Sequence, residues 1–176
     1  MADLEDLERL MSDLESDRVE RKESISDTDR IRQAICAFAN DLPGYRLPGY
    51  LFIGVDDTGR PTSNPITDQL LQTLADMRSD GNILPIPSMV VRKETLRGSP
   101  VVVVEVHPSD TPPVRFKGQV WIRVGPRRAI ATLWVSYASS TSFIVAGIGG
   151  GAHSALPLSS ASMIILSSQT ICHAIS

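Results

Sequence analysis

The 176-residue chain is predicted to fold as a single compact α+β domain, with a mixed sheet and two or three helices, followed by an uncharged tail. Three observations support this prediction. Segments with apolar residues at helical spacing alternate with apolar runs that end in turn residues. Three such runs follow one another late in the chain, which favours α+β over strictly alternating α/β. Charged residues stop at Arg128, and the last 48 residues contain no Asp, Glu, Lys or Arg.

The first half of the chain predicts three helices and two strands. Leucines at helical spacing mark the first helix, which is expected to end near Leu14. A cap residue, Ser26 or Asp27, precedes the second helix, and Gly81 follows the third. The five segments, in order, are LEDLERLMSDLES, RVERKESI, SDTDRIRQAICAFAND, YLFIGVDDTGRP and ITDQLLQTLADMRSD.

The second half predicts three strands and then a tail. PSMVVRKETLRG, SPVVVVEVHPS and GQVWIRVG are apolar runs separated by Gly-containing turns. We therefore expect one domain over residues 1–132 and a separate tail over residues 133–176. The sudden loss of charge in the tail is explained by an altered or truncated reading of the gene, by a disordered extension, or by a marginal membrane span at 133–152. Membrane association is the least favoured of these.

Charge is distributed unevenly along the chain. The formal net charge is −3 and the isoelectric point is about 5.6, values that alone argue against nucleic-acid binding. Residues 1–30 carry eleven acids and five bases, whereas residues 92–128 carry eight bases and three acids. Charges are screened within about 8–10 Å, so a polyanion responds to the local charge and not to the net charge. A basic binding face is therefore compatible with this composition.

The cysteines and the first residues of the chain indicate the cellular compartment. Cys36 and Cys172 are too few for a disulfide framework. The chain does not open with a basic segment followed by an apolar one, as a secretory signal would. We therefore expect a cytoplasmic protein.

Five segments, in order, resemble the Alba-like domain of the Schlafen family and its bacterial relatives. They are ESDRVERKES, ICAFAND, LFIGVDDTGRP, VVVVEVHPSDTPPVRFKG and VWIRVG, and the resemblance covers residues 10–130. It implies a nucleic-acid-binding domain of a transcriptional regulator or a defence-related protein. Relatives also carry DNA-binding or ATP-binding labels, although this chain has no Gly-x-x-x-x-Gly-Lys-Ser/Thr phosphate loop.

The chain departs from the family pattern at two places. Arg21 stands where the family prefers an aromatic residue in the first strand. The segment DLPGYRLPGY, residues 41–50, replaces a Gly-Gly pair that follows the helix ending in Ala-Phe-Ala-Asn. We expect the longer loop to alter the surface that it covers.

The same resemblance implies a metal-dependent nuclease site. Schlafen ribonucleases use three carboxylates, which correspond here to Glu15, Glu20 and Asp57, or Asp56 as the alternative. With Lys22 near the phosphate, these catalytic residues would hold Mg²⁺ or Mn²⁺, ions that prefer oxygen ligands. Positions five apart on one strand point to opposite faces, so Glu15 must lie at a helix end or turn to converge with Glu20. The alternative is that these are surface or hydrogen-bonding acids and that the two aspartates only form a turn.

Basic residues of the late strands form a second candidate site. In PPVRFKGQVWIRVGPRR, cations alternate with other residues, and such alternation can place cations on an exposed face with an aromatic side chain for base stacking. The alternative is an ordinary polar outer face over an apolar inner one. The predicted nucleic-acid-binding residues are Arg92, Lys93, Arg115, Lys117, Arg123, Arg127 and Arg128.

Three functions therefore stay open. The leading hypothesis is DNA or RNA binding, and the second is a Mg²⁺- or Mn²⁺-dependent endoribonuclease. The third is a protein-interaction module that self-associates through its acidic helix and basic strands. Affinity that falls steeply with salt distinguishes the first from the third.

Overall fold

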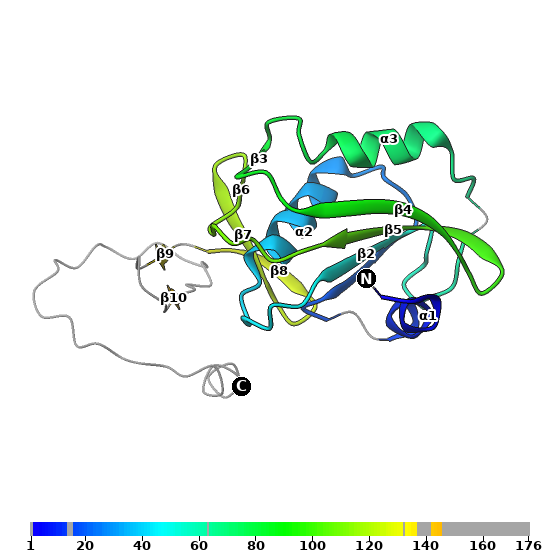
Figure 1. Ribbon diagram of the computed structural model, residues 1–176, viewed down its shortest axis with the longest axis horizontal. Coiled ribbons are helices and arrows are strands. Elements are labelled where there is room, and N and C mark those ends of the chain that lie inside the picture. Colours follow the sequence, from blue (N-terminus) through cyan, green and yellow to red (C-terminus); the bar gives the residue numbers. More distant parts are fainter. Residues whose placement is uncertain (1, 14–15, 63, 132, 137–141, 146–176) are drawn as a thin grey trace, which may run out of the picture.

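The computed structural model describes residues 2–13, 16–62, 64–131, 133–136 and 142–145 (Figure 1). These residues confirm the predicted α+β class, with three helices, a mixed four-stranded sheet and a second four-stranded sheet. Beyond residue 132 the described part is an antiparallel pair, β9 (Leu133–Ser136) and β10 (Ser142–Val145). Within the described residues, no helix is long and apolar enough to span a bilayer.

The central sheet has the strand order β1-β2-β5-β4. Its strands are β1 (Val19–Lys22), β2 (Gly49–Ile53), β4 (Met89–Leu96) and β5 (Ser99–Val106). β1 and β2 run parallel, which needs a long crossover such as the one that contains the helix between them, and the other pairs are antiparallel. β2 and most of β5 are buried on both faces, which explains their continuous apolar sequences.

Three helices cover the two faces of this sheet (Figure 1). α1 (Leu4–Ser12) lies on one face, and α2 (Thr28–Asn40) and α3 (Asp68–Asp76) pack on the other. Each helix begins at a side chain that accepts a hydrogen bond from a backbone N–H of the first turn. The three cap residues are Asp3, Asp27 and Thr67. Of the two candidates predicted for the start of α2, Ser26 and Asp27, the structure uses Asp27.

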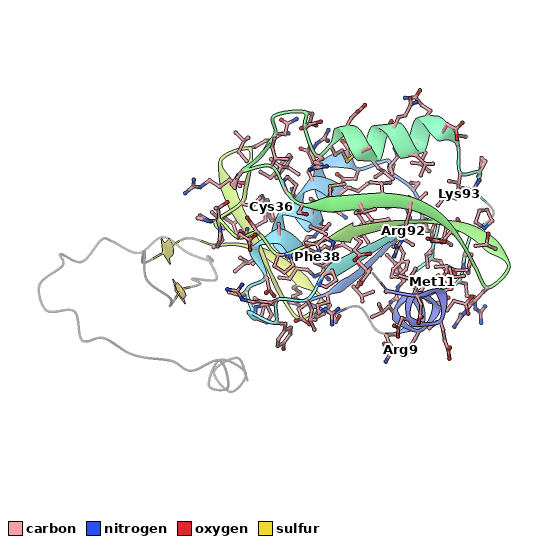
Figure 2. All side chains as sticks on the ribbon, viewed as in Figure 1. Arg9, Met11, Cys36, Phe38, Arg92 and Lys93 are labelled. Atoms are coloured by element: carbon pink, nitrogen blue, oxygen red, sulfur yellow. The ribbon has the colours of Figure 1, made fainter. Side chains whose placement is uncertain are left out.

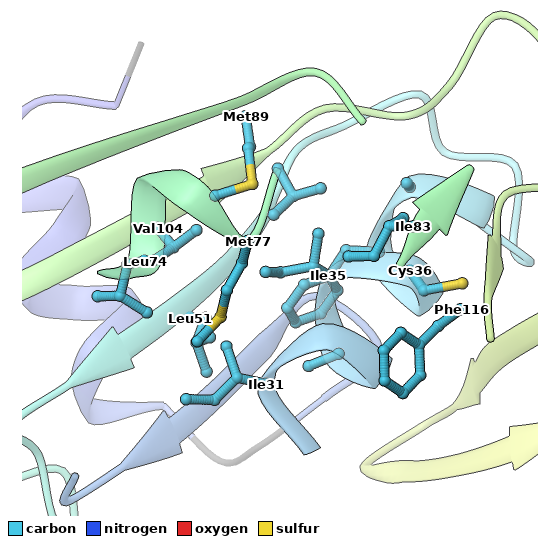
Figure 3. Close-up of a cluster of buried hydrophobic side chains, with 14 of the residues drawn as sticks. Ile31, Ile35, Cys36, Leu51, Leu74, Met77, Ile83, Met89, Val104 and Phe116 are labelled. Atoms are coloured by element: carbon cyan, nitrogen blue, oxygen red, sulfur yellow. The ribbon is translucent and has the colours of Figure 1, made fainter. Parts of the chain in front are cut away.

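Two apolar clusters, one on each face of the central sheet, form most of the core. Figure 3 shows the larger one, in which Ile31 and Ile35 of α2 pack with Leu74 and Met77 against the sheet. In the smaller cluster, Leu7 and Met11 of α1 cover the opposite face. The helical spacing of these residues therefore predicted the correct buried faces.

A second sheet packs beside α2 and has the order β3-β6-β7-β8. Its strands are β3 (Ile83–Leu84), β6 (Arg115–Phe116), β7 (Gln119–Val124) and β8 (Arg127–Ile130). The side-chain amide of Asn40, the last residue of α2, donates to the backbone oxygens of Val114 and Trp121 at 2.9 and 2.7 Å. Its side-chain oxygen accepts from the Val114 N–H at 2.7 Å. Asn40 therefore fixes the second sheet to the end of the helix.

Candidate functional site

Glu20 of β1 lies between the two sheets, in a cluster of basic side chains. It is 2% exposed, and its carboxylate forms an ion pair with Arg123 of β7. Lys22 lies 2.9 Å from the same carboxylate, and Arg128 of β8 lies 3.7 Å from it. The structure thus brings together Glu20 and Lys22, two of the predicted site residues, and adds two arginines from the second sheet.

The Arg123 guanidinium is used inside the protein. The side chain is 2% exposed and donates to the backbone oxygens of Ser16, Val19 and Pro126 at 3.0, 3.3 and 3.2 Å. It also lies 5.3 Å from the centre of the Phe38 ring. Arg123 was predicted to bind nucleic acid, but in this position it joins the second sheet to β1 and α2 and is not accessible to a phosphate.

The two aspartates of GVDDTG follow the end of β2. The Asp56 carboxylate accepts hydrogen bonds from the Thr58 N–H, the Thr58 hydroxyl and the Arg60 N–H at 2.8, 2.7 and 2.9 Å. The backbone hydrogen bond from Arg60 and the hydroxyl of Thr58 lower the pKa of Asp56 below its usual 3.8. Asp57 is exposed. Asp56 therefore stabilises the turn, as the alternative interpretation of this motif expected.

Gly59 ends this turn and allows it to pack against α1. Its φ is +79°, and a Cβ atom there would lie 2.6 Å from the backbone oxygen of Met11. Arg21, which replaces the aromatic residue of the family pattern, is 4% exposed and donates to the same oxygen at 3.0 Å. Arg21 also donates to the backbone oxygen of Asp13, so it binds the orphan carbonyls at the end of α1.

The described residues do not form a metal site. Among them, no three His, Cys, Asp or Glu side chains are placed to hold one ion. The Glu20 carboxylate faces basic side chains, and the Asp56 carboxylate is occupied by its own turn. Glu15 lies outside the described residues, so the three-carboxylate site stays a prediction.

Two of the predicted basic residues lie on β4 and belong to different faces of the central sheet. Arg92 contacts Glu105 and Glu94 at 3.1 and 3.3 Å, and Glu105 is 2% exposed. Lys93 is exposed. Figure 2 shows both residues toward the hairpin that joins β4 to β5, away from the second sheet. They therefore do not share a surface with the other predicted cations.

The remaining predicted cations gather on the second sheet. We call Arg115, Lys117 and Arg127, which lie on β6, the β6–β7 turn and β8, the basic strand surface. Arg128 lies opposite Arg123, on the other face of the sheet, and belongs to the cluster around Glu20. Arg115 and Arg127 are exposed, and among the described residues neither forms an ion pair or a hydrogen bond to another side chain. Lys117 forms an exposed ion pair with Asp29 at 2.7 Å. Arg128 donates to the backbone oxygen of Arg30.

The β-ladders define the two faces of this sheet. Arg115 lies opposite Val120 and Arg127 lies opposite Val124, so both arginines are on the face of β7 that carries even-numbered residues. We call this the outer face. Phe116 lies on the inner face, is 2% exposed and packs in the core. Phe116 therefore cannot stack on a base, in contrast to what the alternation of cations and aromatic residues predicted.

Comparison with known proteins gives the following relatives. The family model described as Schlafen, AlbA_2 matches residues 15–132. The structure is similar to the solution structure of the N-terminal domain of a protein from Nitrosomonas europaea that is described as related to the ATP-dependent DNA helicase RecG. The identity is 24%, the TM-score is 0.54, and the match covers 94% of this chain and 96% of that one.

A crystal structure of the DIP2311 protein from Corynebacterium diphtheriae is more distant. Its identity is 20% and its TM-score 0.45, with 65% of this chain and 25% of that one covered. No curated protein matches the sequence. The family match spans more than half of the chain and covers the five segments found in the sequence. The chain therefore belongs to the Schlafen AlbA_2 family.

Proposed function

We propose that the chain binds nucleic acid through the basic strand surface. One observation supports this most directly: Arg115 and Arg127 are exposed on the outer face without an acidic partner among the described residues, whereas Arg92 and Arg123 are paired with buried carboxylates. Phosphate groups attract such exposed cations and supply most of non-specific affinity. Membership of the Schlafen AlbA_2 family, and a fold shared with a protein described as related to a DNA helicase, are in line with this proposal.

The two arginines lie on one face of the sheet and can contact one polyanion. Their partners Val120 and Val124 are four residues apart on β7, about 13 Å along the strand, and β6 and β8 flank β7, so the arginines lie about 16 Å apart diagonally across the sheet. Lys117 can contribute as well, because its exposed ion pair with Asp29 is worth only about 0–1 kcal/mol and a phosphate can replace it.

Charge reversal tests the proposal. The double substitution Arg115→Glu with Arg127→Glu is expected to weaken binding of labelled RNA and DNA, measured by fluorescence anisotropy, by about tenfold or more. The matched control is Lys93→Glu with Arg78→Glu, which makes the same change in net charge at two exposed positions outside the basic strand surface. The control is expected to bind as the unchanged protein does. Equal losses in both variants would show that the net charge, and not this surface, determines binding.

Metal-dependent RNA cleavage stays a second prediction, based on the family resemblance of Glu15, Glu20 and Asp57. Asp57→Asn is the clearest test, because Asp57 is exposed and its replacement leaves the ion pairs of Glu20 in place. Cleavage of RNA with Mn²⁺ or Mg²⁺ that disappears in this variant, while binding persists, would support a nuclease. RNA that stays intact with the unchanged protein would rule it out.

A further inference from the structure

The loop between α2 and β2 carries exposed side chains that the proposed function does not yet use. This loop, residues 41–48, lies within segment 41–50, one of the two places where the sequence departs from the pattern of the family it resembles. Tyr45 is 57% exposed and Leu47 is 49% exposed, and among the exposed large apolar side chains of the described residues Tyr45 is the one aromatic. Arg46, between them, is exposed too. An exposed aromatic side chain beside a cation is the combination that proteins use to hold single-stranded nucleic acid.

Hydrogen bonds hold the loop in one shape. The Asp41 carboxylate accepts from the Tyr45 N–H at 3.3 Å and from the Arg46 N–H at 2.8 Å, and the Asp41 carbonyl accepts from the Gly44 N–H at 2.8 Å. At the other end, the Arg18 side chain donates to the Pro48 carbonyl at 3.1 Å. A backbone fixed in this way loses little entropy when a ligand binds to its side chains.

The loop also borders the outer face of the second sheet. Leu42 packs in an apolar cluster with Val120 and Ile122 of β7, and Val124 and Ala129 pack against the same cluster. Arg127 lies between Val124 and Ala129 in the sequence and directly opposite Val124 in the sheet. Val120 and Ile122 are buried, so a nucleic acid would reach Arg127 at the border of this face, beside the loop.

We propose that Tyr45 stacks on an unpaired base of a single-stranded nucleic acid whose phosphates are held by the basic strand surface, with Arg46 adding a phosphate or base contact. This inference rests on the proposed function, and it adds a preference for single strands. The π-face of a base is accessible to Tyr45 in a single strand, whereas in a duplex it is covered by the neighbouring base pairs.

The test compares one oligonucleotide as a single strand and as a duplex, by fluorescence anisotropy with the full chain. Tyr45→Ala is expected to weaken binding of the single strand about five- to tenfold, the lower part of the range for one base–aromatic stack, and to leave duplex binding unchanged. Tyr45→Phe keeps the ring and is expected to bind as the unchanged protein does. Leu4→Ala is the control, since Leu4 is 54% exposed on α1. A single strand containing 2-aminopurine should lose fluorescence on binding, and Tyr45→Ala should abolish that loss.

Each other outcome contradicts the inference in a different way. If Tyr45→Ala binds both forms as tightly as the unchanged protein does, Tyr45 makes no base contact, and the proposed function stands without it. If the variant loses affinity equally for both forms, the loop binds the backbone and does not select single strands. If the unchanged protein binds neither form, the proposed function fails together with the inference.

Discussion

Replacing Glu20 by alanine is expected to lower the free energy of unfolding by about 3–5 kcal/mol, the usual cost of removing one partner from a buried ion pair. Glu20 and Arg123 are each 2% exposed, so the guanidinium would keep its charge in a place that water barely reaches. The arginine would keep its bonds to backbone oxygens but would lose its ion pair with Glu20. Lys22 and Arg128 would lose the same partner.

Urea unfolding, followed by circular dichroism, measures this loss. Lys22→Met is the control: Lys22 is more exposed, and removing it leaves the Glu20–Arg123 pair intact, so a change of at most about 1 kcal/mol is expected. The double substitution Glu20→Leu with Arg123→Met removes both charges and should be less destabilising than Glu20→Ala alone. A Glu20→Ala variant that unfolds within about 0.5 kcal/mol of the unchanged protein would refute this account of the pair.

This prediction affects how a nuclease test is interpreted. Domains of this size are stable by only about 5–15 kcal/mol, so Glu20→Ala removes a large part of that stability. Loss of RNA cleavage in this variant would then have two explanations, an absent metal ligand or a partly unfolded protein. Asp57→Asn separates them, since Asp57 is exposed.

Three further predictions follow from the surroundings of single residues. Gly59→Ala is expected to cost about 2 kcal/mol, because the position has a φ of +79° and a Cβ would approach Met11 O at 2.6 Å; an unchanged urea midpoint would contradict this. Burial raises the pKa of Cys36 to about 11. In a Cys172→Ser variant, the Cys36 thiol of the folded protein should therefore resist iodoacetamide at pH 8 and react once the protein is unfolded. Fast labelling of the folded protein would contradict the burial of Cys36. An NMR pH titration should give Asp56 a pKa below 3.8. The hydrogen bonds to its carboxylate therefore stabilise the folded state above that pH, and this contribution is lost as the pH falls. A pKa above 3.8 would contradict the turn geometry.

The sequence predicted the long elements because their patterns are strong. The helical spacing in α2 and the continuous apolar runs of β2 and β5 identify buried faces without information from elsewhere in the chain. β3 and β6 were missed because two-residue strands have no periodicity. β8, RRAI, was missed because a polar strand after a Gly-Pro turn resembles the end of the domain. These short strands exist because they pair with β7 or with each other, which local sequence does not reveal.

The candidate site was less predictable, because its contacts join distant residues. Glu20 and Arg123 are 103 positions apart, and nothing in either segment identifies the other as its partner. For Arg123 a usable signal was present in its own strand. A single charge inside an apolar strand, Glu105 in VVVVEV or Arg123 in VWIRV, indicates a buried charge that needs an opposite partner. Applied to the predicted cations, this rule would have separated Arg123 from the exposed arginines.

The role of the second sheet is tested most directly by the salt dependence of binding. The slope of log affinity against log salt concentration reports the number of phosphates neutralised, at about 0.7–0.9 per contact. If Arg115 and Arg127 each bind a phosphate, replacing both by alanine should reduce the steepness of this slope by about 1.4–1.8, while Lys93→Ala should leave it unchanged. An identical slope for the unchanged protein and the double variant would show that nucleic acid, if bound, does not lie on the basic strand surface.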